Sequence, residues 1–172
     1  VTGLAFKTLL DNTIAEMRRS AEQASVRLPG EDYAFSFEHE KGALVLPPSS
    51  FPALPAQLAE VKALCGVLFG ANINQLLGIR RPVIPGSGVS GSSSYHSFMT
   101  RSNASTGMFE TPYEITFACF TGELATILEA LYKSEHGYIV KAIQVDAIPP
   151  DTKKKAAGQQ SAPTPAQLRA RA

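Results

Sequence analysis

The sequence predicts an α+β protein, because stretches with a period of two residues are followed by stretches that repeat every three or four. The clearest case lies at 112–148. Residues 113–119 alternate between apolar and polar side chains, as in a half-buried strand. Residues 121–136 carry Leu and Ile at helical spacing, and 138–145 is rich in Ile and Val. The stretch therefore predicts a strand, a helix and a second strand.

A similar unit precedes it. Aromatic side chains alternate with small or polar ones over 32–38, which predicts a strand, and 43–46 suits a short returning strand. A helix with one apolar face is predicted over 54–70, followed by an extended segment at 74–84. Two such units together predict a ferredoxin-like βαββαβ sandwich, in which two helices cover one face of an antiparallel sheet.

A long helix is predicted before these units, over 2–28. Its apolar side chains are spaced three or four residues apart, close to the coiled-coil period. Two interpretations stay open: an amphipathic helix on its own sheet, or the end of a coiled coil that continues before residue 1. In the second case, the candidate interface consists of Phe6, Leu10, Ile14, Met17 and Ala21.

Composition divides the chain into three parts. The helix occupies 1–30, and the ferredoxin-like domain occupies 31–150, with a Gly/Ser-rich loop at 85–111. Residues 151–172 are rich in Ala, Gln, Pro and Lys, which predicts a flexible tail. Because the chain opens at Val1 inside a predicted helix, we expect the natural protein to extend further upstream.

Charge and hydropathy narrow the function classes. Sixteen basic and fifteen acidic residues give a net charge of +1, without a basic stripe, so nucleic acid is not an expected partner. The sequence holds no apolar run of about 18 residues, as a membrane span would need. Cys65 and Cys119 fall on apolar faces, which favours buried thiols, although one disulfide remains an alternative.

No catalytic or metal-binding pattern emerges. His39, His96 and His136 are scattered without the spacing of a helical metal site, so neither metal nor cofactor is expected. The serine run at 92–97 includes His96 but lacks the Gly-x-Ser-x-Gly turn of a serine hydrolase. We therefore predict that the protein is not an enzyme.

One binding alternative stays open. Phe35, Phe37, Tyr113 and Phe117 fall on the two predicted central strands, where RNA-recognition domains of this topology stack bases. The residues between them are small or polar and suit the open face, so the rings are predicted to point inward. A ligand- or RNA-binding module using the open sheet face or the serine-rich loop is the alternative function.

Three segments carry a resemblance to a known family. They are FKTLL at 6–10, 58–85 with its closing IRRPVIP, and 112–150 with its opening PYEITF. In their order and spacing the chain resembles the periplasmic part of PilO-like proteins of type IV pilus assembly, above all PilO-like envelope proteins of verrucomicrobia. These are similar to GspM-type proteins of type II secretion. The loop at 85–111 fits the family only loosely, and the relatives continue beyond the tail.

The resemblance implies a non-enzymatic envelope scaffold. It implies a periplasmic domain anchored by a membrane helix ahead of residue 1, partners of the PilN/PilM type, and a homodimer formed through the coiled coil and sheet edges. No functional residue is implied, because the family has no catalytic motif to match.

Overall fold

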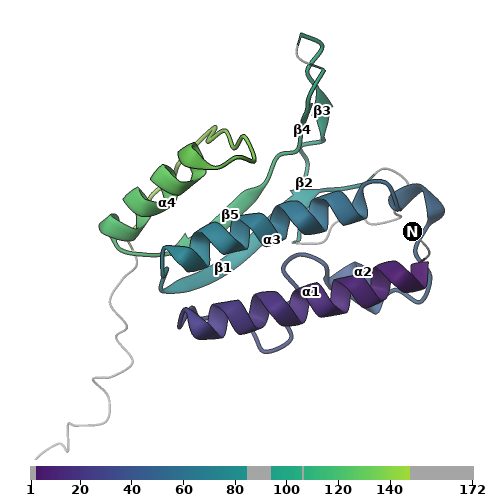
Figure 1. The fold of residues 1–172 in the computed structure, drawn as a ribbon, viewed down its shortest axis with the longest axis horizontal. Coiled ribbons are helices and arrows are strands. Elements are labelled where there is room, and N and C mark those ends of the chain that lie inside the picture. Colours follow the sequence, from purple (N-terminus) through teal and green to yellow (C-terminus); the bar gives the residue numbers. More distant parts are fainter. Residues whose placement is uncertain (1–2, 85–93, 106, 148–172) are drawn as a thin grey trace, which may run out of the picture. The chain divides into compact units, whose positions relative to one another are not determined.

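The computed structural model describes residues 3–84, 94–105 and 107–147. The chain divides into two compact units, 1–139 and 140–172. All helices and strands that the described residues form belong to the first unit (Figure 1). In the second unit, the described residues 140–147 are exposed and form neither helix nor strand.

The first unit contains four α-helices, one short 3-10 helix and five strands within its described residues. In chain order these elements are α1 (Gly3–Gln23), α2 (Glu38–Gly42), the 3-10 helix η1 (Pro48–Ser50), α3 (Leu54–Gly70), β1 (Gln75–Pro82), β2 (Tyr95–His96), β3 (Arg101–Ser102), β4 (Phe109–Glu110), β5 (Glu114–Ala118) and α4 (Thr121–Lys133).

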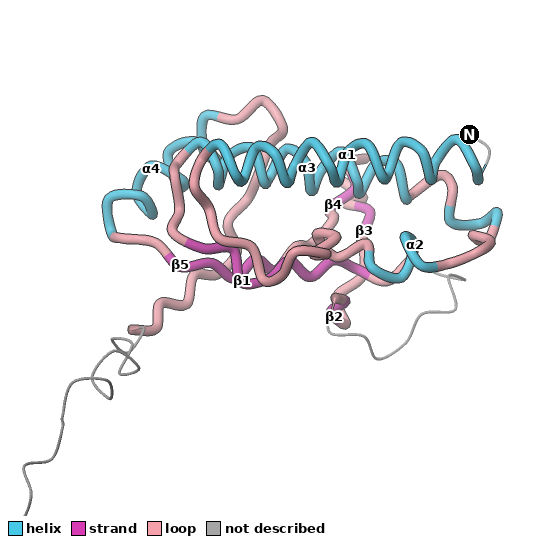
Figure 2. Tube along the Cα trace, turned by 90° about the horizontal axis from the view of Figure 1, so that it is seen from below, coloured by secondary structure: helices cyan, strands magenta, loops and turns pink. Residues whose placement is uncertain are grey.

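The unit has two layers. Figure 2 shows α1, α3 and α4 on one side and the strands β1 and β5 on the other. The main sheet has the order β2-β1-β5, with β5 antiparallel and β2 parallel to the central strand β1. The strands β3 and β4 form a separate antiparallel hairpin, which projects from the rest of the unit (Figure 1).

The helix α1 forms because its apolar stripe is buried in the chain's own core. Phe6, Leu10, Ile14, Met17 and Ala21 are at most 3 % exposed, and α1 packs chiefly on α3. Full burial of a large apolar side chain contributes about 1.5–3 kcal/mol. The stripe predicted from the sequence is therefore part of the core of the first unit.

The predicted helix at 2–28 ends earlier, at residue 23, because the chain turns at Ser25. Ser25 has a left-handed backbone (φ 57°), and the N–H of Val26 reaches back to the carbonyl of Ala21 at 2.8 Å. That is a Schellman-type helix end. Arg27 then leaves the helix and forms a parallel bridge with Gln75, the first residue of β1.

The strand β1 contains an irregularity at Leu77. Leu76 pairs with Phe117 and Gly78 with Thr116, so Leu77 is an extra residue that has no partner on β5. Such a bulge changes which side chains face inward. Leu76, Ile79 and Arg81 are buried, whereas Leu77 is exposed.

The predicted strand at 32–38 is wrong. Its four central residues, 34–37, are all buried instead of alternating between two faces. Phe35 and Ser36 have left-handed backbones (φ 52° and 77°), which no strand accommodates. The segment is a buried turn that leads into α2.

The predicted strands at 43–46 and 138–145 are also absent from the structure, which places no helix or strand at either segment. Leu44 and Val45 are exposed, as are Ile139 and Val145. An apolar, β-branched segment becomes a strand only where a neighbouring strand pairs with its backbone. The described residues supply no such neighbour for either segment.

The predicted α+β class is confirmed, as are the elements predicted at 54–70, 74–84, 113–119 and 121–136. The helices and the small mixed sheet are consistent with a ferredoxin-like core preceded by an extra helix. The segment predicted as a loop at 85–111 differs in part, because it includes β2, β3 and β4. The predicted tail at 151–172 lies outside the described residues.

Two further expectations concern the cysteines and the membrane. Cys65 is buried and Cys119 half-buried, and both are free thiols. Among the described residues, no helix is long and apolar enough to cross a membrane.

Candidate functional site

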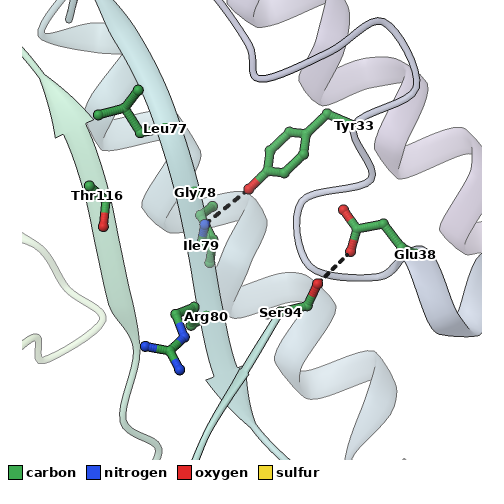
Figure 3. Close-up of a pocket in the computed structure, with 8 residues that line it drawn as sticks. All are labelled: Tyr33, Glu38, Leu77, Gly78, Ile79, Arg80, Ser94 and Thr116. Atoms are coloured by element: carbon green, nitrogen blue, oxygen red, sulfur yellow. Dashed lines mark hydrogen bonds between the residues drawn. The ribbon is translucent and has the colours of Figure 1, made fainter. Parts of the chain in front are cut away.

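A groove of about 510 Å³ lies along β1 (Figure 3). Half of its lining belongs to β1 itself, and the remainder comes from β5, α2 and the segments that precede α2 and β2. The lining residues are Tyr33, Glu38, Leu77, Gly78, Ile79, Arg80, Ser94 and Thr116. The groove thus joins the exposed face of the sheet to the end of the serine-rich segment.

The groove coincides with a gap in strand pairing. On the edge of β1 that faces away from β5, Arg27 pairs at Gln75 and β2 pairs at Arg81 and Pro82. Among the described residues, no strand pairs with β1 on this edge between Gln75 and Arg81. In place of a strand carbonyl, the hydroxyl of Tyr33 accepts the N–H of Ile79 at 3.0 Å (Figure 3).

The turn before α2 fixes Tyr33 in this position. The Arg18 guanidinium donates two hydrogen bonds to the Tyr33 carbonyl (3.2 and 3.1 Å), and the Tyr33 ring packs on Phe35 with 5.0 Å between centroids. Burial raises the pKa of the Tyr33 hydroxyl well above its ordinary value, although the bond from Ile79 lowers it. The hydroxyl therefore stays protonated, with one hydrogen to donate.

The floor of the groove is Gly78. A Cβ atom added there would meet nothing within 4 Å, so the space above this residue is empty of protein. Leu77, with 44 % of its surface exposed, and Thr116 on β5 flank it. The floor is therefore a shallow, mainly apolar notch.

Charged groups of opposite sign mark two borders of the groove. The Glu38 carboxylate accepts hydrogen bonds from the backbone N–H of Ala34 (3.2 Å) and the Ser94 hydroxyl (3.0 Å). The Arg80 guanidinium pairs with Glu114 at 3.0 Å and also donates to the Tyr95 carbonyl at 3.1 Å. Arg80 is thus neutralised within the chain, whereas Glu38 accepts hydrogen bonds from neutral donors alone among the described residues.

A buried ionic cluster lies beneath this end of β1. Arg81 is fully buried, and its guanidinium lies 2.5 Å from the Glu40 carboxylate and 2.6 Å from the Gln57 side-chain oxygen. It also donates to the Ser36 carbonyl and the Tyr95 hydroxyl, both at 3.0 Å. The cluster connects α2, α3, β1 and β2 through one side chain.

Aromatic rings complete the cluster. The Arg81 guanidinium lies 4.2 Å from the Phe37 ring centroid and 4.8 Å from that of Tyr95. Burial raises the pKa of Tyr95 well above its ordinary value, which the nearby Arg81 charge only partly offsets. Tyr95 therefore remains a neutral donor to Glu40 (3.0 Å).

The residues proposed as an interface lie elsewhere. Phe6, Leu10, Ile14, Met17 and Ala21 belong to the core of the first unit. An interface with a second chain at these positions stays a prediction, and it would have to replace contacts that these side chains already make.

The aromatic residues considered for RNA binding point inward, as predicted. Phe35 and Phe37 are fully buried, and Tyr113 and Phe117 are half-buried against the core. The Tyr113 hydroxyl is hydrogen-bonded to Glu60 on α3, and burial raises its pKa well above the ordinary value. The described part of the sheet therefore offers no stacking platform built from these rings.

The structure also locates the three histidines. His39 lies on α2 and His136 follows α4, and both are exposed. His96 is buried, with Nε2 2.8 Å from the Pro112 carbonyl and Nδ1 accepting the N–H of Phe98 at 3.1 Å. Among the described residues, no group of three His, Cys, Asp or Glu side chains could hold a metal ion.

Two further features concern the surface of the first unit. The strand β5 pairs with β1 on one edge and with no described strand on the other. The β3–β4 hairpin and its base expose four large apolar side chains: Phe98, Met99, Met108 and Phe109.

Sequence reasoning did not single out the residues that shape the groove and the cluster. Tyr33 was assigned to a strand, and Gly78, Arg81 and Glu40 received no role. One signal was present: two arginines in an apolar extended segment at 74–84 indicate that one of them faces the core. The sequence alone does not show which.

The chain belongs to a pilus-like family, whose model matches residues 1–172. This membership supports a pilus-associated structural protein rather than an enzyme. No curated protein matches the chain.

Several solved structures share the fold. A crystal structure of the core domain of a protein from Akkermansia muciniphila has a TM-score of 0.60 at 13 % identity, covering 78 % of this chain and 70 % of that one. A second crystal structure from Akkermansia muciniphila has a TM-score of 0.59 at 14 % identity, covering 76 % of this chain and 61 % of that one.

A third structure, also from Akkermansia muciniphila, lacks the transmembrane region of its protein. Its TM-score is 0.59 at 14 % identity, and the match covers 77 % of this chain and 61 % of that one. The chain thus spans about three fifths of the length of the last two proteins. At these identities, the similarity concerns the fold alone.

Proposed function

We propose that the protein is a PilO-like assembly component of a pilus-like or secretion-like apparatus, and that it works by binding other subunits through the free edge of β5. The pilus-like family supports the setting, and the observation that carries the mechanism is the edge of β5 with which no described strand pairs. An exposed strand edge offers a row of backbone donors and acceptors for a strand of another chain.

The direction of the backbone groups on β5 follows from its pairing with β1. The N–H of Ile79 points away from β5, toward Tyr33, so Ile79 and its partner Ile115 form a non-hydrogen-bonded pair. The backbone groups of Ile115, and of Phe117 two residues later, therefore point outward. Figure 2 shows α4 in the helix layer, and among the described residues no strand pairs with this edge of β5.

A second copy of the chain fits this edge. In an antiparallel pair centred on Thr116, Ile115 lies opposite Phe117 of the second copy, and these two residues exchange hydrogen bonds. Glu114 then lies opposite Ala118, so like charges do not meet. Aromatic–aliphatic and Thr–Thr pairs favour such pairing by about 0.2–1 kcal/mol each. The interface is isologous and closes as a homodimer.

The test places charges at the centre of the proposed pair. Thr116→Lys puts two ammonium groups opposite each other, and Thr116→Glu does the same with carboxylates, while neither change buries a charge within one chain. We expect the wild type to sediment as a dimer and each variant alone as a monomer. An equimolar mixture of the two variants should again sediment as a dimer, because opposite charges then meet.

Thr126→Lys, on the exposed face of α4, is the matched control and should leave the dimer intact. The proposed edge is refuted if the wild type is monomeric, if either variant alone dimerises like the wild type, or if the mixture stays monomeric. A photo-crosslinker at Thr116 in cells would then ask whether the edge meets a second copy or a PilN/PilM-like protein.

The proposal includes the location of the protein. We place it in the periplasm, as the outer part of a protein with a membrane anchor ahead of residue 1. A relative of the same fold was solved without its transmembrane region, which supports this placement. Protease protection in intact and lysed spheroplasts tests it: digestion of the domain in intact spheroplasts is expected, and protection until lysis would contradict it.

A further inference from the structure

We propose that His96 is a proton-operated clasp at the base of the β3–β4 hairpin. Its neutral imidazole holds the two legs of the hairpin together, and protonation in mildly acidic solution releases them. The clasp uses no residue of the β5 edge, so it does not depend on the dimer proposed above.

The imidazole of His96 joins the two chain segments that form the base of the hairpin. His96 ends β2 and is 7 % exposed. Its Nδ1 accepts the N–H of Phe98 at 3.1 Å, on the segment that leads into β3. Its Nε2 lies 2.8 Å from the carbonyl of Pro112, on the segment that follows β4. One ring thus connects both legs of the hairpin, which projects from the rest of the unit (Figure 1).

These two partners fix the position of the ring hydrogen. A backbone N–H can only donate a hydrogen bond, and a backbone carbonyl can only accept one. Nδ1 therefore carries no hydrogen, and Nε2 carries the single hydrogen of a neutral imidazole. Because both ring nitrogens are in use, His96 takes up no proton without losing a hydrogen bond.

Protonation of the ring is incompatible with the closed base. A second hydrogen on Nδ1 would point at the N–H of Phe98, so two donors would face each other. The bond to Phe98 then breaks, and the two legs separate. Because a proton binds only where the base has opened, acid shifts the balance toward opening. Histidine is the side chain whose ordinary chemistry changes its charge between about pH 5 and pH 8.

The ionisable neighbours of His96 do not supply a new partner for a charged ring. Two buried tyrosines flank the clasp along the chain, and burial raises their pKa, so they stay neutral. The charged residues on the adjoining elements lie in pairs of opposite sign. The tyrosines are Tyr95 and Tyr113, and the pairs are Arg80 with Glu114, Arg81 with Glu40 and, opposite each other in the hairpin, Arg101 and Glu110.

The clasp controls an apolar surface. Phe98 and Met99 follow His96 directly, Met108 and Phe109 lie on the other leg, and between 53 % and 76 % of each residue is exposed. A two-stranded hairpin has little stability of its own, so its base decides whether its legs stay together. Closed, the hairpin presents these side chains together; opened, it divides them into two pairs.

The test follows the ring of His96 and the amide of Phe98 by NMR in the full chain. At pH 7.5 the ring nitrogen shifts should place the hydrogen on Nε2. From pH 7.5 to 5.5, exchange of the Phe98 amide with water, corrected for its intrinsic pH dependence, should rise about tenfold. The reason is that an imidazole in water, with a pKa of about 6.5, is protonated ten to one at the lower pH. The Leu76 amide, bonded to the Arg27 carbonyl at 2.9 Å, should not change.

Two variants separate titration from structure. His96→Gln keeps the clasp without the proton site, because its carboxamide oxygen can accept the N–H of Phe98 while its NH₂ donates to Pro112. Its corrected Phe98 exchange should agree within about twofold at the two pH values, against the tenfold change expected for the wild type. His39→Gln, at an exposed histidine on α2, is the matched control and should keep the full rise.

Three outcomes would overturn the proposal: a hydrogen on Nδ1 at pH 7.5, no faster exchange of Phe98 at pH 5.5 in the wild type, or an equal rise in His96→Gln. If His96→Gln proves unstable, the ring nitrogen shifts and the Phe98 exchange of the wild type still decide. Because the β5 dimer is measured by sedimentation of Thr116 variants, failure of either proposal leaves the other standing.

Discussion

Arg81 and Glu40 form an ion pair in the core, with 2.5 Å between guanidinium and carboxylate and side-chain exposures of 0 % and 3 %. Oε1 of Glu40 makes this contact and accepts a hydrogen bond from Tyr95, whereas Oε2 has no hydrogen-bond partner among the described residues. Such a pair contributes little net stability, because two charges lose their hydration, but removing one partner leaves a charge buried alone. Tyr95 on β2 is hydrogen-bonded to both partners, so the pair links α2, β1 and β2.

Arg81→Met should lower the free energy of unfolding by about 3–5 kcal/mol, because Glu40 then stays buried without its partner. Arg80→Met, one residue earlier and paired at the surface, should cost less than about 1 kcal/mol. Urea unfolding followed by circular dichroism measures both. Similar losses for the two variants would mean that Arg81 is not the buried arginine.

The double variant Arg81→Met, Glu40→Leu should be more stable than Arg81→Met alone, since no unpaired carboxylate remains in the core. The same urea experiment gives the coupling between the two positions. If the two single losses simply add, the close ion pair does not exist.

Leu10→Ala should cost about 2–5 kcal/mol, because Leu10 is buried between α1 and α3, and the shorter side chain leaves a cavity. Leu9→Ala is the control, because Leu9 is the neighbouring residue but is 47 % exposed. Its free energy of unfolding should stay within about 0.5 kcal/mol of the wild type. Thermal unfolding at two protein concentrations checks this. A loss at Leu10 that depends on protein concentration would instead indicate an interchain role for this stripe.

Stability should fall between about pH 9 and pH 12, in part because of Cys65. Burial raises the pKa of its thiol from 9.0 to about 12, so above pH 9 the unfolded chain releases a proton that the folded chain keeps. The contribution is complete below pH 9 and declines by about 1.4 kcal/mol per pH unit as pH rises toward the folded value.

Cys65→Ala isolates that contribution, because it removes the titrating group. The urea midpoint of the variant should depend less steeply on pH between 9 and 10, because the tyrosines contribute equally to both proteins and only the wild type contains the Cys65 thiol. Parallel curves for wild type and variant would show that Cys65 ionises equally easily in both states.

Ser25→Gly should raise the free energy of unfolding by about 1 kcal/mol, since Ser25 has a left-handed backbone at the end of α1, where glycine carries no steric cost. Ser20→Gly, inside the same helix, should lower it by several tenths of a kcal/mol. Thermal unfolding compares the pair. Destabilisation by both changes would contradict the helix end described here.

The strongly periodic segments were predictable, because their patterns report burial on one face. The helix at 54–70 and the strand at 113–119 follow from the spacing of their apolar residues alone. The segment at 32–38 misled for a physical reason: alternating aromatics also occur in a turn that is buried on all sides. Phe35 and Ser36 adopt left-handed backbones although neither is glycine, so the sequence does not mark this turn.

The groove was out of reach of sequence reasoning because it depends on what is missing beside β1. A strand pattern does not reveal whether a neighbour covers its whole edge. Tyr33 reaches Ile79 across 46 positions of sequence, and such contacts leave no local periodicity. Glu40, on a short charged helix, equally gave no sign of burial.

The conformation of Leu77 in β1 determines which of two adjacent arginines is buried. With Leu77 bulged out, the buried positions step from Leu76 to Ile79 and then to Arg81. If Leu77 were instead paired as a regular strand residue, strict alternation from Leu76 would turn Arg80 inward and leave Arg81 at the surface. Deleting Leu77 would remove the bulge and leave Leu76, Ile79 and Arg81 in regular alternation, so the same arginine would stay buried. The bulge thus lets the strand carry one more residue without changing the interior of the unit.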